Sequence, residues 1–199
     1  MEHSLVCIAG GSGSGKSTLA ISLYKKYPDL ITIVGLDDYY KSAEEAPRYE
    51  KGINWETPNA LRFDDLARDI EALLSGKTIK VRSKHEVYNP DYRPSLRNKL
   101  EVELMPKRII LLEGYLALLD PRIRNRMAFG LFLDMPIEKS VLRRSENKVR
   151  QSDEYFNEVL FASHEAIVAP TIKYADIMLD SAEISAARIL LMTENMLQV

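Results

Sequence analysis

A glycine-rich run near the N-terminus constrains this chain more than any other feature. It lies between the apolar residues 5–9 and a stretch with helical spacing, and it fits the pattern Gly-x-x-x-x-Gly-Lys-Ser. Glycines let such a loop curl until its backbone N–H groups point at phosphate oxygens, and the following helix adds its positive end. The sequence therefore predicts a phosphate-binding loop made of Gly10, Gly11, Ser12, Gly13, Ser14, Gly15, Lys16, Ser17 and Thr18.

The polar residues of this loop indicate which ligand it binds. In such loops the lysine, here Lys16, reaches the β- and γ-phosphates, and the hydroxyl of the next residue, here Ser17, holds Mg²⁺. Glu113 directly follows the apolar run 109–112, which is the place of an acid that orders Mg²⁺ or its waters. We therefore expect ATP, with GTP as an alternative donor, and Mg²⁺ as cofactors.

Apolar runs and helical patterns alternate along the chain. The runs 5–9, 31–34, 109–112, 131–133 and 177–179 are typical of buried parallel strands. Strands separated by helices predict a P-loop NTPase-type, three-layer α/β/α fold with a mostly parallel central sheet. A length of 199 residues suits a single domain.

Two segments depart from that alternation. In residues 77–105, short stretches of alternating apolar and charged residues flank a polar middle, which predicts a small inserted antiparallel β-hairpin. The segment at about 143–152 contains arginines and follows a predicted helix start at Pro136. Residues 35–58 are polar and aromatic without a steady period, which favours a long functional loop.

Composition excludes several classes of partner. The net charge is −2, so no overall field attracts nucleic acid or an anionic membrane. The single cysteine, Cys7, excludes an internal disulfide, and the apolar stretch that contains it is too short for a signal peptide or a membrane span. We expect a cytoplasmic protein that acts on small molecules, without nucleic acid or membrane.

The second predicted strand ends at Asp37, at the edge of the sheet where ligands collect in open α/β folds. A carboxylate there can accept a proton from a substrate hydroxyl during phosphoryl transfer. A GTPase would carry a guanine-reading Asn-Lys-x-Asp motif. The nearest match, residues 98–101, ends in glutamate and precedes a strand where that motif would follow one. These observations favour a small-molecule kinase.

Several further motifs resemble those of the uridine kinase family, in the wider group that includes phosphoribulokinase. They occur in the family's order and span most of the chain. Beside the glycine-rich loop they are Leu-Asp-Asp-Tyr-Tyr-Lys at 36–41, Asn-Trp-Glu-Thr-Pro-Asn-Ala at 54–60, Leu-Glu-Gly-Tyr-Leu at 112–116, Arg-Arg at 143–144 and Ala-Pro-Thr-Ile-Lys-Tyr-Ala-Asp at 169–176.

The resemblance implies an activity and a set of roles. Asp37 matches the catalytic base that activates a sugar 5′-hydroxyl, and Tyr40 matches a tyrosine of the substrate pocket. Glu56 stands where the family usually has an aspartate that binds ribose hydroxyls, and Arg144 matches a lid arginine that meets the transferring phosphate. The implied reaction is ATP-dependent phosphorylation of uridine or cytidine, a step of pyrimidine salvage.

The residues that would hold the nucleobase depart from the family pattern, which has Tyr-Asp-Phe followed by histidine and arginine. In one alignment Tyr88 and Asn89 replace Tyr-Asp and Arg93 follows. In the other, Asp91 and Tyr92 replace Asp-Phe and Arg97 follows. The family histidine has no clear match, and we expect the nearby His85 to lie at the surface. In the lid, Lys148 and Arg150 would supply charge that the family usually takes from an Arg-Gly-Arg sequence.

These departures leave the acceptor open. The alternatives are a kinase for another small hydroxyl substrate, such as a sugar phosphate, nicotinamide riboside or pantothenate, and a nucleotide-binding regulatory module with little transfer activity. An exposed apolar face on the inserted hairpin would favour a homo-oligomer, but the sequence by itself does not report one.

Overall fold

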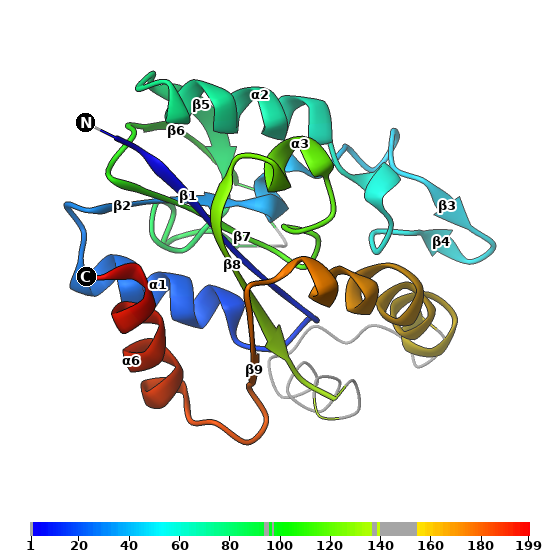
Figure 1. Cartoon of the computed structure of the whole chain (residues 1–199). Coiled ribbons are helices and arrows are strands. Elements are labelled where there is room, and N and C mark those ends of the chain that lie inside the picture. The colour runs from blue at the N-terminus through cyan, green and yellow to red at the C-terminus, as the bar shows by residue number, and fades with distance from the viewer. Residues whose placement is uncertain (1, 94–95, 97, 137–138, 140–154) are drawn as a thin grey trace.

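The computed structural model describes residues 2–93, 96, 98–136, 139 and 155–199. A parallel sheet of five strands forms its centre (Figure 1). Its strands, in spatial order, are β2 (Ile31–Gly35), β7 (Ile109–Glu113), β1 (Ser4–Gly10), β8 (Met127–Asp134) and β9 (Ile177–Asp180). All the predicted apolar runs are therefore strands of one sheet, and β8 begins four residues earlier than the sequence pattern predicts.

Helices cover both faces of this sheet, as Figure 1 shows. Successive side chains of a strand point to opposite faces, and the central strand β1 is buried on both. Leu5, Cys7 and Ala9 pack in a core with α2 (Phe63–Leu74) and α3 (Pro121–Arg124). Val6 and Ile8 pack in a second core with α1 (Lys16–Lys26) and α6 (Ala186–Leu197). The result is the predicted three-layer α/β/α fold.

Local signals in the sequence account for several element ends. Pro28 follows α1 closely, and Gly76, with a φ of 79°, follows α2. Asp120 caps α3, because its side chain accepts a hydrogen bond from Arg122 N. Ser185 caps α6 in the same way, with Arg188 N as the donor. Such caps satisfy N–H groups that have no partner inside the helix.

The insertion is an antiparallel pair, β5 (Ile79–Ser83) and β6 (Leu100–Leu104), in which Val81 lies opposite Val102. Ile79, Val81 and Leu104 pack into the core under α2, while Lys80 and Arg82 face outward. A second two-stranded sheet, β3 (Arg48–Tyr49) and β4 (Gly52–Ile53), forms within the predicted long loop. That loop also contains the 3₁₀ turns η1 (Leu36–Tyr39) and η2 (Pro58–Ala60).

The segment before β9 is helical but not a regular α-helix. It contains π-helical turns in η3 (Phe156–Phe161) and η4 (His164–Val168), followed by the 3₁₀ turn η5 (Ala169–Tyr174). Pro170 lies at the start of η5, so the helical path continues past this proline. The helix predicted to start at Pro136 leads into residues outside the described ranges. None of the helices in those ranges is long and apolar enough to cross a membrane.

Candidate active site

The glycine-rich loop joins β1 to α1 and has the curled shape that its sequence predicts. Gly10 has a φ of 140° and Gly15 a φ of 94°, values that other residues rarely adopt. A Cβ on Gly10 would lie 2.2 Å from the carbonyl oxygen of Leu133 on β8. Glycine is therefore required at position 10 both by the backbone angle and by the neighbouring strand.

Lys16 begins α1 and is buried, with 8% of its surface exposed. Its Nζ donates a hydrogen bond of 2.7 Å to the carbonyl oxygen of Gly11, so the ammonium group is folded back over the loop. The loop curvature, the start of α1 and this charge lie together. This arrangement suits the binding of a polyphosphate.

Ser17 and Glu113 meet although 96 residues separate them in the chain. The Ser17 hydroxyl donates to Glu113 Oε2 at 3.0 Å, across the end of β7. Burial, and then the negative charge of Asp37, raise the pKa of Glu113 to about 7, against the opposing effects of Lys16 and Ser17. A hydroxyl beside a buried carboxyl fits Mg²⁺, which is usually held by one or two carboxylates together with water and phosphate oxygens. In the described ranges no three His, Cys, Asp or Glu side chains cluster to hold a metal by themselves.

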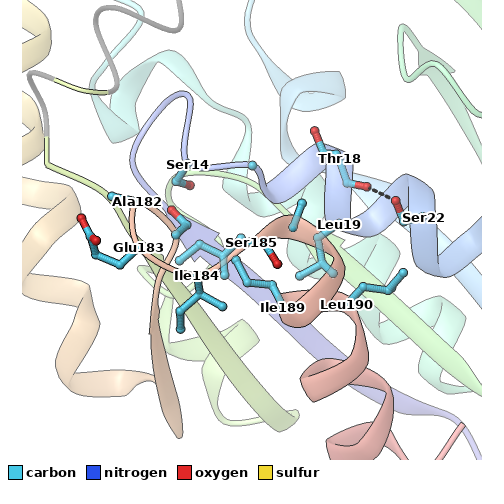
Figure 2. A pocket seen from close by; sticks show the side chains of 14 residues that line it. Ser14, Thr18, Leu19, Ser22, Ala182, Glu183, Ile184, Ser185, Ile189 and Leu190 are labelled. Carbon is cyan, nitrogen blue, oxygen red and sulfur yellow. Dashed lines mark hydrogen bonds between the residues drawn. The ribbon is translucent and has the colours of Figure 1, made fainter.

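A cavity of about 460 Å³ adjoins the phosphate loop (Figure 2). Ser14, Gly15 and Thr18 border it on one side, and the start of α6 with the segment before it borders it on the other. Its apolar lining comes from Leu19, Leu133, Ile184, Ile189 and Leu190. The sequence analysis missed this cavity, because helical spacing in residues 184–197 does not say which helix lies beside the loop.

Asp37 lies at the opposite end of the site, in η1 directly after β2. Its side chain is half exposed, and Lys84 Nζ lies 3.1 Å from its Oδ2. Desolvation by the cavity wall alone would raise the pKa of Asp37. The charges of Lys84, and then of Lys16 and Lys99, outweigh that effect and lower its pKa below the ordinary value. Asp37 is therefore a charged carboxylate at the edge of the sheet.

Asp38, its neighbour, is held by the inserted hairpin through both of its carboxylate oxygens. Its Oδ2 accepts a hydrogen bond of 2.6 Å from the Ser83 hydroxyl, and its Oδ1 accepts one of 2.8 Å from Lys84 N. Lys99 Nζ donates to the Asp38 carbonyl oxygen at 3.2 Å. Two adjacent aspartates therefore differ in their contacts, and Asp38 joins η1 to the hairpin.

Asp37 borders a second cavity, of about 950 Å³, between η1, the 54–62 loop, α2 and the hairpin. Tyr40 and Glu56 both line it, as predicted from the sequence. The Tyr40 ring meets Trp55 edge-on, with 5.5 Å between the ring centroids. Glu56 Oε1 accepts a long hydrogen bond of 3.5 Å from the Tyr155 hydroxyl. The aromatic loop therefore forms part of the wall around these groups.

Tyr88, predicted to bind substrate, lies elsewhere. Its hydroxyl accepts from Ile33 N at 2.9 Å and donates to Ile33 O at 3.1 Å. Because β2 is an edge strand, these bonds satisfy backbone groups that no neighbouring strand pairs. The ring also packs edge-on against Tyr24. Tyr88 thus supports the sheet edge and does not line the 950 Å³ cavity.

The other predicted hairpin residues fall into two groups. Asp91 and Arg93 are exposed and do not line the cavity, whereas Tyr92 between them does. Arg97 lies outside the described residues, as do Arg144, Lys148 and Arg150 of the predicted lid.

His85 is buried, so the expectation of a surface histidine is wrong. Burial is the main reason that its pKa is lowered. Its Nδ1 accepts from Val87 N at 3.3 Å, and its Nε2 lies 3.9 Å from Glu113 Oε1.

Sequence reasoning also missed residues that reach the cavity. Lys84 follows β5 and Lys99 precedes β6, and Arg82 lies on the outward face of β5. The alternation in residues 79–82 does predict that Arg82 faces outward. Nothing in the sequence indicated that this hairpin lies beside η1.

Comparison with known proteins identifies the family. The family model described as phosphoribulokinase / uridine kinase matches residues 5–186. A uridine kinase of Brevibacillus brevis is 33% identical over 185 residues, covering 88% of this chain and 83% of that protein. One from Clostridium perfringens is 31% identical over 184 residues, covering 86% and 84%. The structure of a possible uridine kinase from Bacillus stearothermophilus is similar in fold, with a TM-score of 0.60, 18% identity and 90% coverage of both chains. This chain therefore belongs to the phosphoribulokinase / uridine kinase family of P-loop kinases.

Proposed function

We propose that this chain transfers the terminal phosphoryl group of ATP to a primary hydroxyl of a small acceptor, with the 5′-hydroxyl of uridine or cytidine as the first acceptor to test. The observation that carries the proposal is the position of Asp37. It is a charged carboxylate that borders a large cavity and interacts electrostatically with Lys16 of the phosphate loop. A carboxylate base that lies close enough to interact with a phosphate-binding lysine suits phosphoryl transfer.

The donor nucleotide binds along the loop of residues 10–18. Backbone N–H groups of the loop and Lys16 bind its phosphates, and its base occupies the 460 Å³ cavity between α1 and α6. Ser17 and Glu113 hold Mg²⁺, which when bound neutralises charge on the phosphate oxygens. GTP remains an alternative donor, because much of the lining of this cavity is apolar.

Asp37 removes the proton of the acceptor hydroxyl. The hydroxyl oxygen then forms a bond to the γ-phosphorus, while the bond from that phosphorus to the β–γ bridging oxygen breaks and ADP leaves. Lys16 stabilises the charge that develops on the transferring group. We assign the same task to Arg144 and the lid at 143–152, on the family resemblance alone.

Tyr40 and Glu56 hold the acceptor. The Glu56 carboxylate can accept hydrogen bonds from sugar hydroxyls, and Tyr40 supplies an aromatic surface beside Asp37. Uridine is supported by the name of the related enzymes, and cytidine by the family resemblance of the motifs alone. The cations of the hairpin favour a second candidate class, another small hydroxyl compound such as a sugar phosphate or pantothenate.

A substrate panel tests the proposal. Purified protein, ATP and Mg²⁺ are incubated with nucleosides, nicotinamide riboside, pantothenate, sugars and sugar phosphates, and ADP release and phosphorylated product are both measured. We expect acceptor-dependent ADP release and a product heavier by one phosphoryl group. Nucleotide binding without any phosphorylated product would overturn the proposal and support a regulatory module.

A further inference from the structure

Three cations lie together on the hairpin side of the 950 Å³ cavity: Arg82, Lys84 and Lys99, here called the cation cluster. They come from β5, from the residue after it and from the residue before β6. Lys84 brings the cluster into contact with Asp37, at 3.1 Å. A group bound by the cluster would therefore lie within a small molecule's length of the proposed base.

Asp37 and Asp38, the two aspartates beside the cluster, are already engaged. Asp37 pairs with Lys84, and the Asp38 carboxylate accepts hydrogen bonds from Ser83 and from Lys84 N. Lys99 Nζ donates a hydrogen bond to the carbonyl oxygen of Asp38 rather than to its carboxylate. Over the described parts of the chain, no carboxylate oxygen lies within 4.0 Å of the side-chain nitrogens of Arg82 or Lys99.

Three other cations of the same cavity have carboxylate partners, whereas Lys41, which follows η1, has none among the described residues. Lys80 pairs with Glu103 at 3.3 Å, although it lies on the same strand as Arg82. Arg82 has Glu101 opposite it in the β5–β6 register, yet the two side chains do not form an ion pair. Arg62 and Arg68, on the opposite wall, are also paired, with Glu45 and with Asp65. Among the described residues of the hairpin wall, Arg82 and Lys99 are thus the cations of this cavity without a carboxylate partner.

The surroundings of Lys99 make its charged form less stable. Desolvation is the main cause that lowers its pKa, and repulsion by Lys84 and Arg82 lowers it further, against the attraction of Asp38 and Asp37. An anion bound among the three side chains would reverse that effect, since an opposite charge nearby favours the charged form of a lysine.

We propose that the acceptor carries an anionic group, a phosphate or a carboxylate, which Arg82, Lys84 and Lys99 bind while the acceptor's hydroxyl meets Asp37. This inference rests on the kinase function proposed above and names the substrate class of that site. Arg82 suits the two-pronged binding of such a group, and the lysines add point charges. The cluster determines specificity and takes no part in the bond changes.

Matched pairs of acceptors test this directly. Each pair keeps a primary hydroxyl and differs by one anionic group: uridine 3′-monophosphate with uridine, cytidine 3′-monophosphate with cytidine, fructose 6-phosphate with fructose, and glycerate with glycerol. The phosphate and carboxylate pairs together show which anion the site takes. In at least one pair we expect kcat/KM to be about ten- to a hundredfold higher for the anionic member, the range of charge-assisted hydrogen bonds.

Variants of the cluster show which side chains cause the preference for an anionic acceptor. Arg82→Gln and Lys99→Gln should each reduce the preference for the anionic member about tenfold, through KM. The neutral member should lose much less kcat/KM than the anionic member, and in Lys99→Gln some loss for both is expected because the Lys99 charge also lowers the pKa of Asp37. Lys77→Gln is the matched control, since Lys77 is an exposed cation that precedes the same hairpin and does not line the cavity.

The outcomes separate this inference from the kinase proposal. If the neutral member of every pair is turned over as well as or better than the anionic member, the inference of an anionic acceptor is wrong. The proposal that the protein is a kinase is then unaffected. Equal loss for charged and neutral acceptors in the Arg82 and Lys99 variants also overturns it, because the cluster would then serve the fold or the base. If no acceptor of either kind is phosphorylated, the kinase proposal itself is wrong.

Discussion

The donor and acceptor ends of this site are built in different ways. The donor end is a contiguous stretch, residues 10–18, whose shape comes from glycine backbone angles and from the start of α1. The acceptor end combines η1, the 54–62 loop, α2 and the inserted hairpin, and its character comes from side chains. Backbone groups and a short motif fix phosphate binding within a few residues. Acceptor choice depends on side chains that can change one at a time without disturbing the sheet.

The first prediction tests the donor end and carries the largest expected effect. Lys16→Ala should reduce phosphoryl transfer by about 10³-fold or more, because a charge placed against the transferring phosphate contributes on that order. The fold should persist, because the hydrogen bond of Lys16 Nζ to the Gly11 carbonyl lies within the phosphate loop and the core of the sheet does not depend on it. ADP release measures phosphoryl transfer, and circular dichroism measures whether the fold persists. Lys25→Ala, an exposed position on the same helix, is the control, and near-normal turnover of Lys16→Ala would show that the loop does not serve transfer.

The second prediction compares the adjacent aspartates of the acceptor end. Asp37→Asn should lower kcat by about 10²- to 10⁴-fold with little change in nucleotide affinity, the range for loss of a general base. Asp38→Asn should instead lower the free energy of unfolding by about 1–2 kcal/mol, because one of its two hydrogen-bonded oxygens becomes an amide. Turnover at saturating acceptor measures kcat, and urea unfolding measures stability, so the two assays separate the effects of the two variants. An equal loss of kcat and nucleotide binding in Asp37→Asn would make Asp37 structural.

The third prediction concerns Glu113, which is linked electrostatically to both ends of the site. In the unfolded chain its carboxyl titrates near 4.5, and in the folded protein its pKa is raised to about 7. Between these values the folded state binds the extra proton, so its contribution to stability is full below about pH 4.5 and is lost as the pH rises to about 7. The loss should amount to about 3 kcal/mol.

Urea unfolding in Mg²⁺-free buffer from pH 4.5 to 7.5 measures this effect. Glu113→Gln keeps a neutral side chain at every pH. The stability of the wild-type protein relative to this variant should therefore fall as the pH rises through that window. A difference that stays constant with pH would show that Glu113 is ionised in the folded protein throughout.

The fourth prediction has the smallest effect and separates the hairpin's structural residues from its cavity residues. Tyr88→Phe should lower the free energy of unfolding by about 1 kcal/mol, because it removes the hydroxyl bonded to both backbone groups of Ile33. KM for the acceptor should not change, since Tyr88 does not line the cavity. A Tyr88→Phe variant with wild-type stability and a raised KM would instead restore Tyr88 to the substrate site.

Much of the fold could be predicted because its signals are local. Apolar runs predicted the strands, and the adjacent residues Asp120 and Pro121 account for the cap at the start of α3. The π-helical turns in η3 and η4 could not be predicted, because the residue pattern of residues 155–168 is also compatible with an α-helix. The backbone shape of the phosphate loop was predictable too, because it depends on glycines close together in the chain and on the strand and helix beside them.

The sequence by itself determined the phosphate loop, the parallel sheet and the candidacy of Asp37, because each depends on residues close together in the chain or on the direction in which strands run. Only the tertiary structure decided that Ser17 meets Glu113, that Asp38 holds the hairpin and that Tyr88 seals the edge of β2. It also decided that Lys84 and Lys99 face Asp37. These contacts join segments 45 to 96 residues apart in the chain, as for Asp38 with Ser83 and Ser17 with Glu113. Their partners depend on how the insertion packs on the sheet, which no local pattern encodes.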